Sequence, residues 1–322
     1  MSEYQIIKAL EQFVGRQILG QERLITRLLV ALLADGHLLV EGVPGLAKTS
    51  AVKALAAGIE GDFHRIQFTP DLLPADLTGT EVFQPREGTF AFQKGPVFHN
   101  FLLADEINRA PAKVQSALLE AMAERQVTIG RTTYPLDDLF LVMATQNPIE
   151  QEGTYALPEA QRDRFLLHVT VDYPSPGTEQ QILRLVRQRM ITGATEAPSK
   201  LDRVSRQTIM SARQQVLGLH LADELETYIV RLVEASRHPE QYDRQLADYI
   251  AYGASPRGTI ALDLASRAHA WLQGRDYVSP EDLQQIAPDV LRHRILLSYH
   301  AEADAITIEA VIQRLLMLVP VP

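Results

Sequence analysis

The sequence predicts an α/β fold in which a parallel sheet is followed by an all-helical region. Three apolar runs in the first half of the chain carry this prediction, at residues 37–41, 101–105 and 140–144. Each run is apolar enough to be buried on both faces, and segments of helical periodicity separate them. This pattern is typical of parallel strands joined by crossover helices. The chain has 322 residues and is therefore long enough to form two domains.

Turn and helix signals divide the chain further. Residues 85–88, Pro-Arg-Glu-Gly, separate two strand-like segments, so we predict a β-hairpin inserted in the α/β layer at 78–98. Two prolines and a glycine in residues 173–177 predict a linker, and we place the boundary between an α/β domain (1–172) and a helical domain (173–322) there. Within the second domain, Ser255 and Ser279 each precede a proline and are predicted helix N-caps.

Composition excludes several classes of function. Lysine and arginine number 31 against 40 acidic residues, and the net charge of −9 disfavours general binding to nucleic acid. The chain has no cysteine, which excludes disulfides, thiolate metal sites and cysteine nucleophiles. Its nine histidines are scattered and predict no metal site. The N-terminus lacks a secretory signal and no apolar run approaches 18 residues, so we expect a cytoplasmic protein without membrane insertion.

A Walker A loop follows the first apolar run and opens a predicted helix. Its residues are Gly42, Val43, Pro44, Gly45, Leu46, Ala47, Lys48, Thr49 and Ser50. In such a loop, backbone N–H groups surround phosphate oxygens, Lys48 reaches the β- and γ-phosphates, and Thr49 is a ligand of Mg²⁺. Ala47 stands where glycine usually precedes the lysine. We expect it to lie within the helix start at negative φ, where a methyl group is tolerated. The alternative is a glycine-rich turn with an incidental lysine.

Two strand ends supply polar partners for this loop. Asp105 and Glu106 close the second apolar run, where Asp105 would hold Mg²⁺ through water and Glu106 would act as general base. Asn147 follows the predicted strand 139–145 and would sense the γ-phosphate or its attacking water. The alternatives are a solvated strand end for the carboxylates and a turn cap for Asn147.

Two arginines in the later part of the chain are further candidates. Arg257 falls in the first turn of the helix that Ser255 caps, where a cation opposes the helix dipole. This placement suggests an anionic partner such as phosphate, the alternative being an exposed arginine of negligible cost. Arg164 precedes a predicted strand at 166–171, a position at which a surface ion pair is common.

Six motifs extend along most of the chain. They are G-V-P-G-L-A-K-T (42–49), L-L-A-D-E-I-N-R-A-P (102–111), Q-S-A-L-L-E-A-M (115–122), A-T-Q-N-P (144–148), L-P-E-A-Q-x-D-R-F (157–165) and G-A-S-P-R (253–257). With these motifs the chain resembles the MoxR family of AAA+ ATPases. Alanine at position 47 is usual in that family, whereas Arg162 stands where relatives commonly have leucine.

The resemblance implies an AAA+ P-loop core with a parallel sheet, in which the hairpin at 78–98 is the helix-2 insert, followed by an all-α lid. It implies ATP and Mg²⁺ as cofactors. It also gives roles to single residues: Asn147 is similar to sensor 1, Arg257 to the sensor 2 arginine, and Arg164 to an arginine finger that reaches a neighbouring subunit's nucleotide. Ile18, Leu19 and Gly20 resemble the segment that lines the adenine pocket.

The function implied is an ATP-hydrolysing homo-oligomeric ring, a hexamer, that remodels protein clients as a chaperone does. MoxR relatives typically work with partners that carry a von Willebrand factor A (VWA) domain, in complex maturation or metal-cofactor insertion. One alternative is a nucleic-acid motor of the same AAA+ clade, which the net charge and the balanced charges of the hairpin disfavour. The other is an ATP-binding scaffold with little turnover, against which the intact Asp105, Glu106 and Asn147 argue.

Overall fold

The computed structural model describes residues 1–148, 154–192 and 202–322, and the chain divides into two compact units. The first unit contains Met1–Leu29, His37–Leu157 and Val169–Met210, and the second contains Val30–Gly36, Pro158–His168 and Ser211–Pro322. Each unit is therefore assembled from segments that are distant in the sequence. A single boundary between residues 172 and 173 stays a prediction.

The central sheet has five strands in the order β2-β5-β8-β1-β9. These strands are β1 (Leu38–Glu41), β2 (Phe63–Gln67), β5 (Phe101–Asp105), β8 (Leu141–Gln146) and β9 (Leu167–Thr170). The pairs β1–β8, β5–β8 and β2–β5 are parallel, and Met143 lies opposite both Leu38 and Leu103. The three apolar runs thus form the three adjacent central strands, with nearly every side chain buried. The predicted parallel α/β sheet is confirmed.

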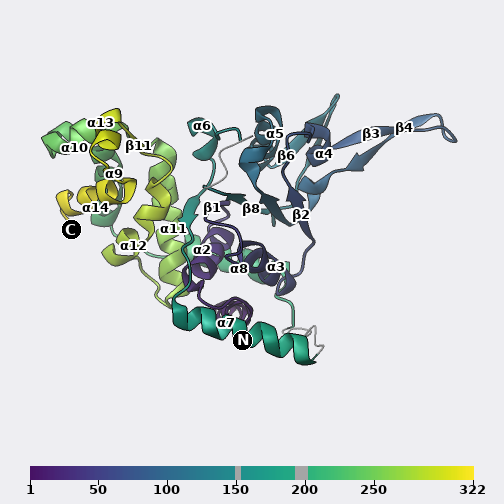
Figure 1. Ribbon diagram of the computed structural model, residues 1–322, viewed down its shortest axis with the longest axis horizontal. Helices are drawn as coiled ribbons and strands as arrows, with labels where there is room; N and C mark the ends of the chain where they lie inside the picture. The colour runs from purple at the N-terminus through teal and green to yellow at the C-terminus, as the bar shows by residue number, and fades with distance from the viewer. Residues whose placement is uncertain (149–153, 193–201) are drawn as a thin grey trace. The chain divides into compact units, whose positions relative to one another are not determined.

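Helices of the first unit lie on both sides of this sheet. Figure 1 shows α3 (Lys48–Ala57) and α5 (Ala112–Glu124) on opposite sides of the strands. The other helices that lie mainly in this unit are α1 (Glu3–Gln17), α2 (Glu22–Leu33), α4 (Pro74–Thr78) and α7 (Pro176–Thr192). Helix α7 begins inside the predicted linker, because proline is well suited to the first position of a helix. Helix α1 packs on α3 and starts at a capping box between Ser2 and Gln5.

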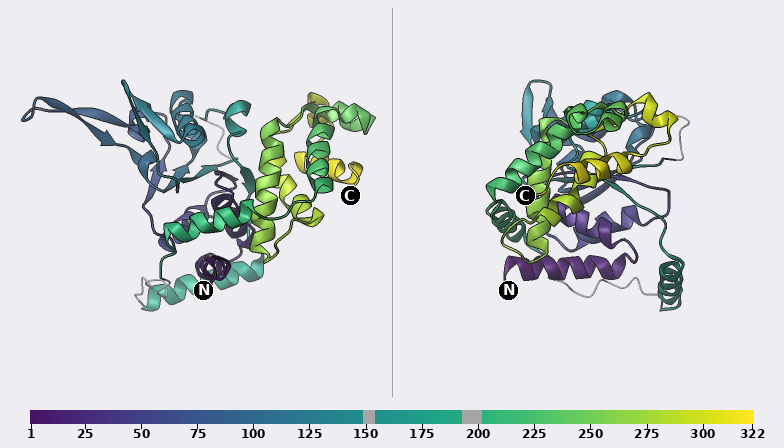
Figure 2. Two further views of the ribbon diagram at one scale, coloured as in Figure 1. Left: turned by 180° about the vertical axis from the view of Figure 1, so that it is seen from behind. Right: turned by 90° about the vertical axis from the view of Figure 1, so that its left-hand side faces the viewer.

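Two antiparallel hairpins extend from the first unit. The predicted hairpin is confirmed as β3 (Gly79–Gln84) and β4 (Thr89–Lys94), which project away from the sheet in Figure 1 and, from behind, in Figure 2. Its side chains are largely exposed, including Phe83 at 50% and Phe90 at 67%. A second hairpin, β6 (Gln126–Ile129) and β7 (Thr132–Pro135), was not predicted. Phe92 stacks on Tyr134 with 4.1 Å between ring centroids, so the two hairpins are packed together.

The second unit is mainly helical. Helix α8 (Arg206–Leu217) has residues in both units. The other elements of the second unit are α6 (Glu159–Arg162), α9 (Asp223–Arg237), α10 (Arg244–Tyr249), α11 (Pro256–Leu272), α12 (Pro280–Leu291), α13 (Tyr299–Ala303), α14 (Ile308–Leu318) and the short strands β10 (Ile250–Tyr252) and β11 (Leu296–Leu297). Both predicted N-caps are confirmed: Ser255 accepts a hydrogen bond from the backbone N–H of Arg257, and Ser279 forms a capping box with Asp282.

Asp282 is the centre of a buried ionic network in this unit. One of its oxygens accepts from His269 Nδ1 at 2.7 Å, and Arg275 donates to both oxygens at 2.5 Å. Ser279 adds its backbone N–H at 2.8 Å and its hydroxyl at 3.0 Å. Burial raises the pKa of Asp282, but these hydrogen bonds together outweigh burial and hold the pKa well below its usual range.

Replacing Asp282 by alanine is expected to lower the free energy of unfolding by about 3–5 kcal/mol, because the partly buried Arg275 guanidinium and the buried His269 ring lose the carboxylate that they contact. Urea denaturation followed by circular dichroism measures this change. The matched control is Glu281→Gln, an exposed acid in the same turn, which should lose much less stability than Asp282→Ala. In the wild type, the contribution of Asp282 is present above its unfolded pKa of about 3.9 and is lost as pH falls through the folded pKa. Equal losses in both variants would contradict this account.

No helix in the described part of the chain is both long and apolar enough to cross a membrane. The same residues contain no group of three or more His, Asp or Glu side chains placed to hold a metal ion.

Candidate functional site

The loop between β1 and α3 has the backbone geometry of an anion cradle. Gly45 and Ala47 have positive φ values of 87° and 57°, and alternation of left- and right-handed residues turns successive N–H groups toward one point. The first N–H groups of α3 add donors that have no partner one turn back in the helix. At the base of the loop, a Cβ on Gly42 would lie 2.7 Å from the carbonyl oxygen of Val171, so glycine is required for this close approach.

The conformation predicted for Ala47 is wrong. We expected negative φ within the helix, but Ala47 is the N-cap of α3 at φ 57° and ψ 15°, in the left-handed region. The helix begins one residue later than expected, and an N-cap residue does not share the helical dihedral angles. An alanine in this region costs roughly 1–2 kcal/mol, which explains why glycine is common at this position of the motif.

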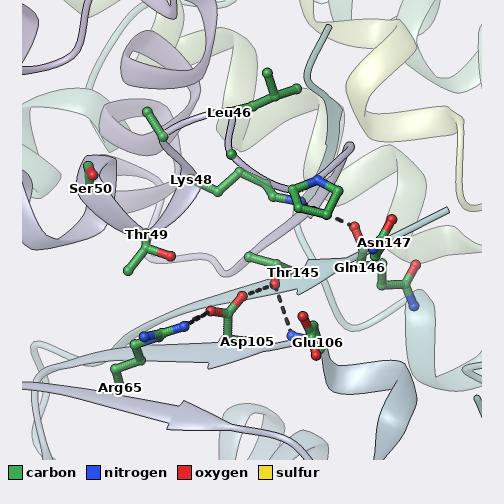
Figure 3. Close-up of a pocket in the computed structure, with 13 residues that line it drawn as sticks. Leu46, Lys48, Thr49, Ser50, Arg65, Asp105, Glu106, Thr145, Gln146 and Asn147 are labelled. Carbon is green, nitrogen blue, oxygen red and sulfur yellow. Dashed lines mark hydrogen bonds and ion pairs between the residues drawn. The ribbon is translucent and has the colours of Figure 1, made fainter. Parts of the chain in front are cut away.

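The loop and the carboxyl ends of β5 and β8 enclose a cavity of about 350 Å³ (Figure 3). Ten of the predicted site residues line it: Pro44, Gly45, Leu46, Ala47, Lys48, Thr49, Ser50, Asp105, Glu106 and Asn147. Gly42 and Val43, at the start of the loop, are not among its lining residues. The structure therefore brings the Walker A loop, the carboxylate pair and Asn147 together at one edge of the sheet.

Lys48 extends from the start of α3 toward the strand ends. Its Nζ donates to the carbonyl oxygens of Gly42 and, at 3.5 Å, Gln146. Burial lowers the pKa of Lys48, and the nearby carboxylates of Asp105, Glu106 and Glu41 oppose that shift. An anion in the cavity would supply the counter-charge that the half-buried ammonium favours.

Asp105 is held by two side chains that the sequence did not indicate. Thr145 Oγ1 donates to one carboxylate oxygen at 2.5 Å and accepts from the backbone N–H of Glu106 at 2.9 Å. Arg65 on β2 donates to the other oxygen through Nε at 3.1 Å and Nη2 at 2.6 Å (Figure 3). Thr145 could have been found from its place at a strand end beside Asn147. Arg65 gave no signal, because β2 was not predicted.

Glu106 lies in a left-handed conformation, φ 57° and ψ 50°, directly after β5. Its Oε2 accepts from Gln67 Nε2 at 2.7 Å and from Arg109 Nη1 at 2.9 Å. Left-handed non-glycine residues are uncommon and concentrate at functional sites, because neighbouring structure must enforce them. Two donors and a constrained backbone thus set the direction of this carboxylate at the cavity.

The donors in the cavity fit a divalent cation beside a phosphate group. Thr49 offers a hydroxyl and Asp105 a carboxylate, and both line the same cavity as the backbone cradle. Hard cations such as Mg²⁺ prefer oxygen ligands and often bind through one or two carboxylates together with substrate phosphates. The site thus has the chemistry for a metal-bound polyphosphate.

A second, more apolar cavity of about 200 Å³ adjoins the loop. Ile18 and Leu19, which the resemblance assigns to an adenine pocket, line it together with Gly45, Leu46, Ala47 and Ser50. Gly20 is at a turn with φ 76° beside them and is not among the lining residues. The other wall of the cavity was not predicted from the sequence. It is formed by Pro174 and by Ile182, Leu185 and Val186 of α7.

Arg164 and Arg257 belong to the second unit, whereas the described lining residues of both cavities belong to the first. Arg164 directly follows the short helix α6 and its C-cap Asp163, and its side chain is partly buried. Arg257 lies in the first turn of α11, as predicted, and is exposed.

Comparison with known proteins places the chain in a family. Residues 37–167 match the ATPase family associated with various cellular activities (AAA), and residues 245–315 match the AAA lid domain. The chain is 50% identical to Chaperone MoxR1 of Mycobacterium tuberculosis over 96% of this chain and 80% of that protein. It is 34% identical to Protein MoxR of Methylorubrum extorquens over 89% and 86%. A crystal structure from Cytophaga hutchinsonii superposes with a TM-score of 0.90 at 47% identity, covering 99% of this chain and 96% of that one. The chain therefore belongs to the MoxR family of AAA+ ATPases.

Proposed function

We propose that the protein binds ATP together with Mg²⁺ and hydrolyses the anhydride bond between its β- and γ-phosphates. The convergence of Lys48, Thr49, Asp105, Glu106 and Asn147 on one cavity carries this proposal. The loop N–H groups and Lys48 would bind the β- and γ-phosphates, while Thr49 and, through water, Asp105 would hold the metal. The metal, when bound, neutralises charge on the phosphate oxygens.

Hydrolysis requires a base and a correctly placed water. Glu106 is the base, and Gln67 and Arg109 orient its carboxylate through the hydrogen bonds described above. Asn147, buried at the end of β8, orients the attacking water or contacts the γ-phosphate. Ile18 and Leu19 hold the adenine ring beside α7, with Gly20 at the adjoining turn, because apolar side chains favour a flat, weakly polar ring.

The two arginines complete the site in an oligomer. Arg257 acts as the sensor 2 arginine on the nucleotide of its own chain. Arg164 acts as an arginine finger on the nucleotide of a neighbouring subunit, where it neutralises charge that develops in the transition state. A finger of this kind works only between subunits, so we propose a homo-oligomeric ring, a hexamer.

The ring remodels protein clients. The Mycobacterium tuberculosis relative is named a chaperone, which supports a client that is itself a protein. The β3–β4 hairpin, with Phe83 and Phe90 exposed, offers an apolar element for contact with such a client. We propose that the clients are VWA-domain proteins and that the outcome is complex maturation or metal-cofactor insertion, in the cytoplasm.

Affinity capture from the native source tests the client class. A Glu106→Gln variant, loaded with ATP and Mg²⁺, is expected to retain a VWA-domain protein that mass spectrometry identifies. The control variant Lys48→Ala/Glu106→Gln cannot bind nucleotide and is expected to lose that partner. Recovery of nucleic acid instead of protein, with hydrolysis stimulated by DNA, would contradict the proposal and favour a nucleic-acid motor.

A further inference from the structure

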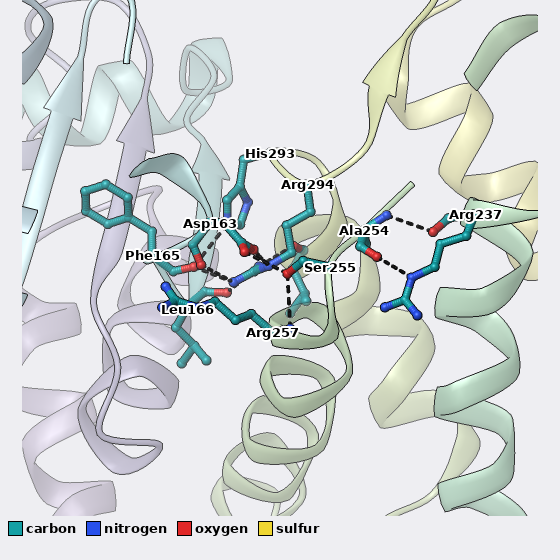
Figure 4. Close-up of polar contacts among 11 residues, drawn as sticks. Asp163, Phe165, Leu166, Arg237, Ala254, Ser255, Arg257, His293 and Arg294 are labelled. Atoms are coloured by element: carbon teal, nitrogen blue, oxygen red, sulfur yellow. Dashed lines mark hydrogen bonds and ion pairs between the residues drawn. The ribbon is translucent and has the colours of Figure 1, made fainter. Parts of the chain in front are cut away.

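The segment around Arg164 is held by a buried arginine, Arg294, in the turn that follows α12. The Arg294 side chain is only 2% exposed, and its Nε donates to Asp163 Oδ1 at 2.9 Å. Its two terminal nitrogens donate to the carbonyl oxygens of Phe165 at 2.6 Å and Leu166 at 3.1 Å. His293 Nε2 also contacts the Phe165 carbonyl oxygen, at 3.0 Å (Figure 4). The backbone on both sides of Arg164 is therefore fixed.

The second oxygen of Asp163 connects this segment to helix α11. Ser255 Oγ donates to Asp163 Oδ2 at 2.7 Å. The same Oγ accepts from the backbone N–H of Arg257 at 3.1 Å, as the N-cap of α11 (Figure 4). One carboxylate thus links the residue next to Arg164 with the first turn of the helix that carries Arg257.

The charges of these groups indicate which of the contacts described above is permanent. Burial lowers the pKa of Arg294 to about 10, although Asp163 raises it, and Arg257 lowers it further. Arg294 stays charged at neutral pH, and an unpaired buried guanidinium is costly, so the ion pair with Asp163 is a fixed anchor. The Ser255 hydroxyl carries no charge and can be removed without stranding a buried ion.

We propose that Asp163 and Ser255 are positioning residues that hold Arg164 and Arg257 in one rigid block. Resting on the roles proposed above for these arginines, the block makes Arg164 follow any movement of α11. Engagement of Arg257 with the nucleotide of its own subunit then sets the position of Arg164 at the site of the neighbouring subunit. The state of one site is passed to the next through one carboxylate and one hydroxyl.

The variant Ser255→Gly tests this link. Glycine is an acceptable N-cap that costs only a few tenths of a kcal/mol, so the helix persists while the hydroxyl is lost. We expect kcat for ATP hydrolysis to fall about tenfold, since small misplacements of a positioned group have effects of this order or larger. The dissociation constant of a fluorescent ATP analogue should change less than about twofold, and Ser255→Thr, which keeps a hydroxyl, should restore kcat.

A matched control separates positioning from capping. Thr307 caps α14 in the same unit by accepting from the backbone N–H of Ala310 at 3.2 Å. Thr307→Gly removes a cap of the same kind without touching Asp163, and kcat should stay within about twofold of wild type. Thermal unfolding of both variants verifies that they are folded. An equal loss of kcat in Thr307→Gly would overturn the proposal.

A double-mutant cycle shows whether Ser255 acts through Arg164. In an Arg164→Ala background, Ser255→Gly is expected to cause no further fall in kcat, because the group that it positions is gone. The same tenfold loss in both backgrounds would overturn the proposal, as would an unaffected Ser255→Gly enzyme. The proposed function fails separately, if Arg164→Ala itself hydrolyses ATP at the wild-type rate.

Mixed oligomers test the direction of the effect. When Arg164→Ala subunits are mixed with Glu106→Gln subunits, the active sites are those in which an Arg164→Ala subunit supplies the intact Glu106. The neighbouring Glu106→Gln subunit supplies the intact Arg164 to such a site. Adding Ser255→Gly to the Glu106→Gln subunit changes only the subunit that supplies Arg164. The turnover of the mixture should then fall about tenfold. Unchanged turnover would refute transmission between subunits.

Discussion

Replacing Glu106 by glutamine is expected to lower kcat for ATP hydrolysis by about 10²–10⁴-fold, the range for loss of a general base. Glutamine has nearly the same size and keeps an oxygen that can accept from Gln67 and Arg109, but it cannot take a proton from water. The cradle, Lys48 and the proposed metal ligands are unchanged. The dissociation constant of ATP should therefore stay within about twofold of the wild-type value, as expected when only transition-state interactions are lost.

Two measurements on each variant test this expectation. Steady-state phosphate release gives kcat, and titration with a fluorescent ATP analogue gives the dissociation constant. Lys48→Ala should lose binding as well as turnover, whereas Glu120→Gln, an exposed acid on α5, should resemble the wild type. A Glu106→Gln enzyme that turns over at the wild-type rate would remove Glu106 from the mechanism.

Replacing Arg164 by alanine is expected to lower kcat by about 10³–10⁵-fold with little change in ATP affinity, the effect of losing an arginine finger. The guanidinium would stabilise charge only in the transition state and only on the neighbour's nucleotide, so ground-state binding is spared. Arg231→Ala, at an exposed position of α9, is the control and should keep the wild-type rate.

The intersubunit character of Arg164 has its own signature. Arg164→Ala and Glu106→Gln are each expected to be nearly inactive alone, but mixing the two should recover part of the turnover. Complementation of this kind is impossible if Arg164 acts on the nucleotide of its own chain. A mixture as slow as the separate variants, in oligomers shown by light scattering to be mixed, would contradict the finger role.

The sequence predicted the centre of the fold better than its edge, for a physical reason. Strands β1, β5 and β8 are buried on both faces and must be apolar throughout, which makes them visible as runs. In β2, at the end of the sheet order, only Ile66 is buried, and the strand has no such run. Arg65 and Gln67, which bind the two carboxylates, were missed with it.

The candidate site was predictable where its residues are contiguous. The loop at Gly42–Ser50 and the pair at Asp105 and Glu106 each carry their chemistry within a few positions. The wall of the second cavity from α7 is more than 150 residues from Ile18, and nothing local to either segment announces the contact. The error at Ala47 is of another kind, because it depends on which residue begins a helix, and sequence patterns locate helix ends poorly.

The pairing of Arg65 with Asp105 bears on the order in which ligands arrive. A carboxylate that already faces a guanidinium attracts a free cation less strongly, because the two positive charges repel each other. A cation carried by a polyphosphate arrives with negative charge of its own, and that charge gives Arg65 another partner. We therefore expect the empty site to bind free Mg²⁺ weakly and the Mg²⁺–nucleotide complex tightly. Cellular energy charge, and not the concentration of free metal, would then govern how often the site is occupied.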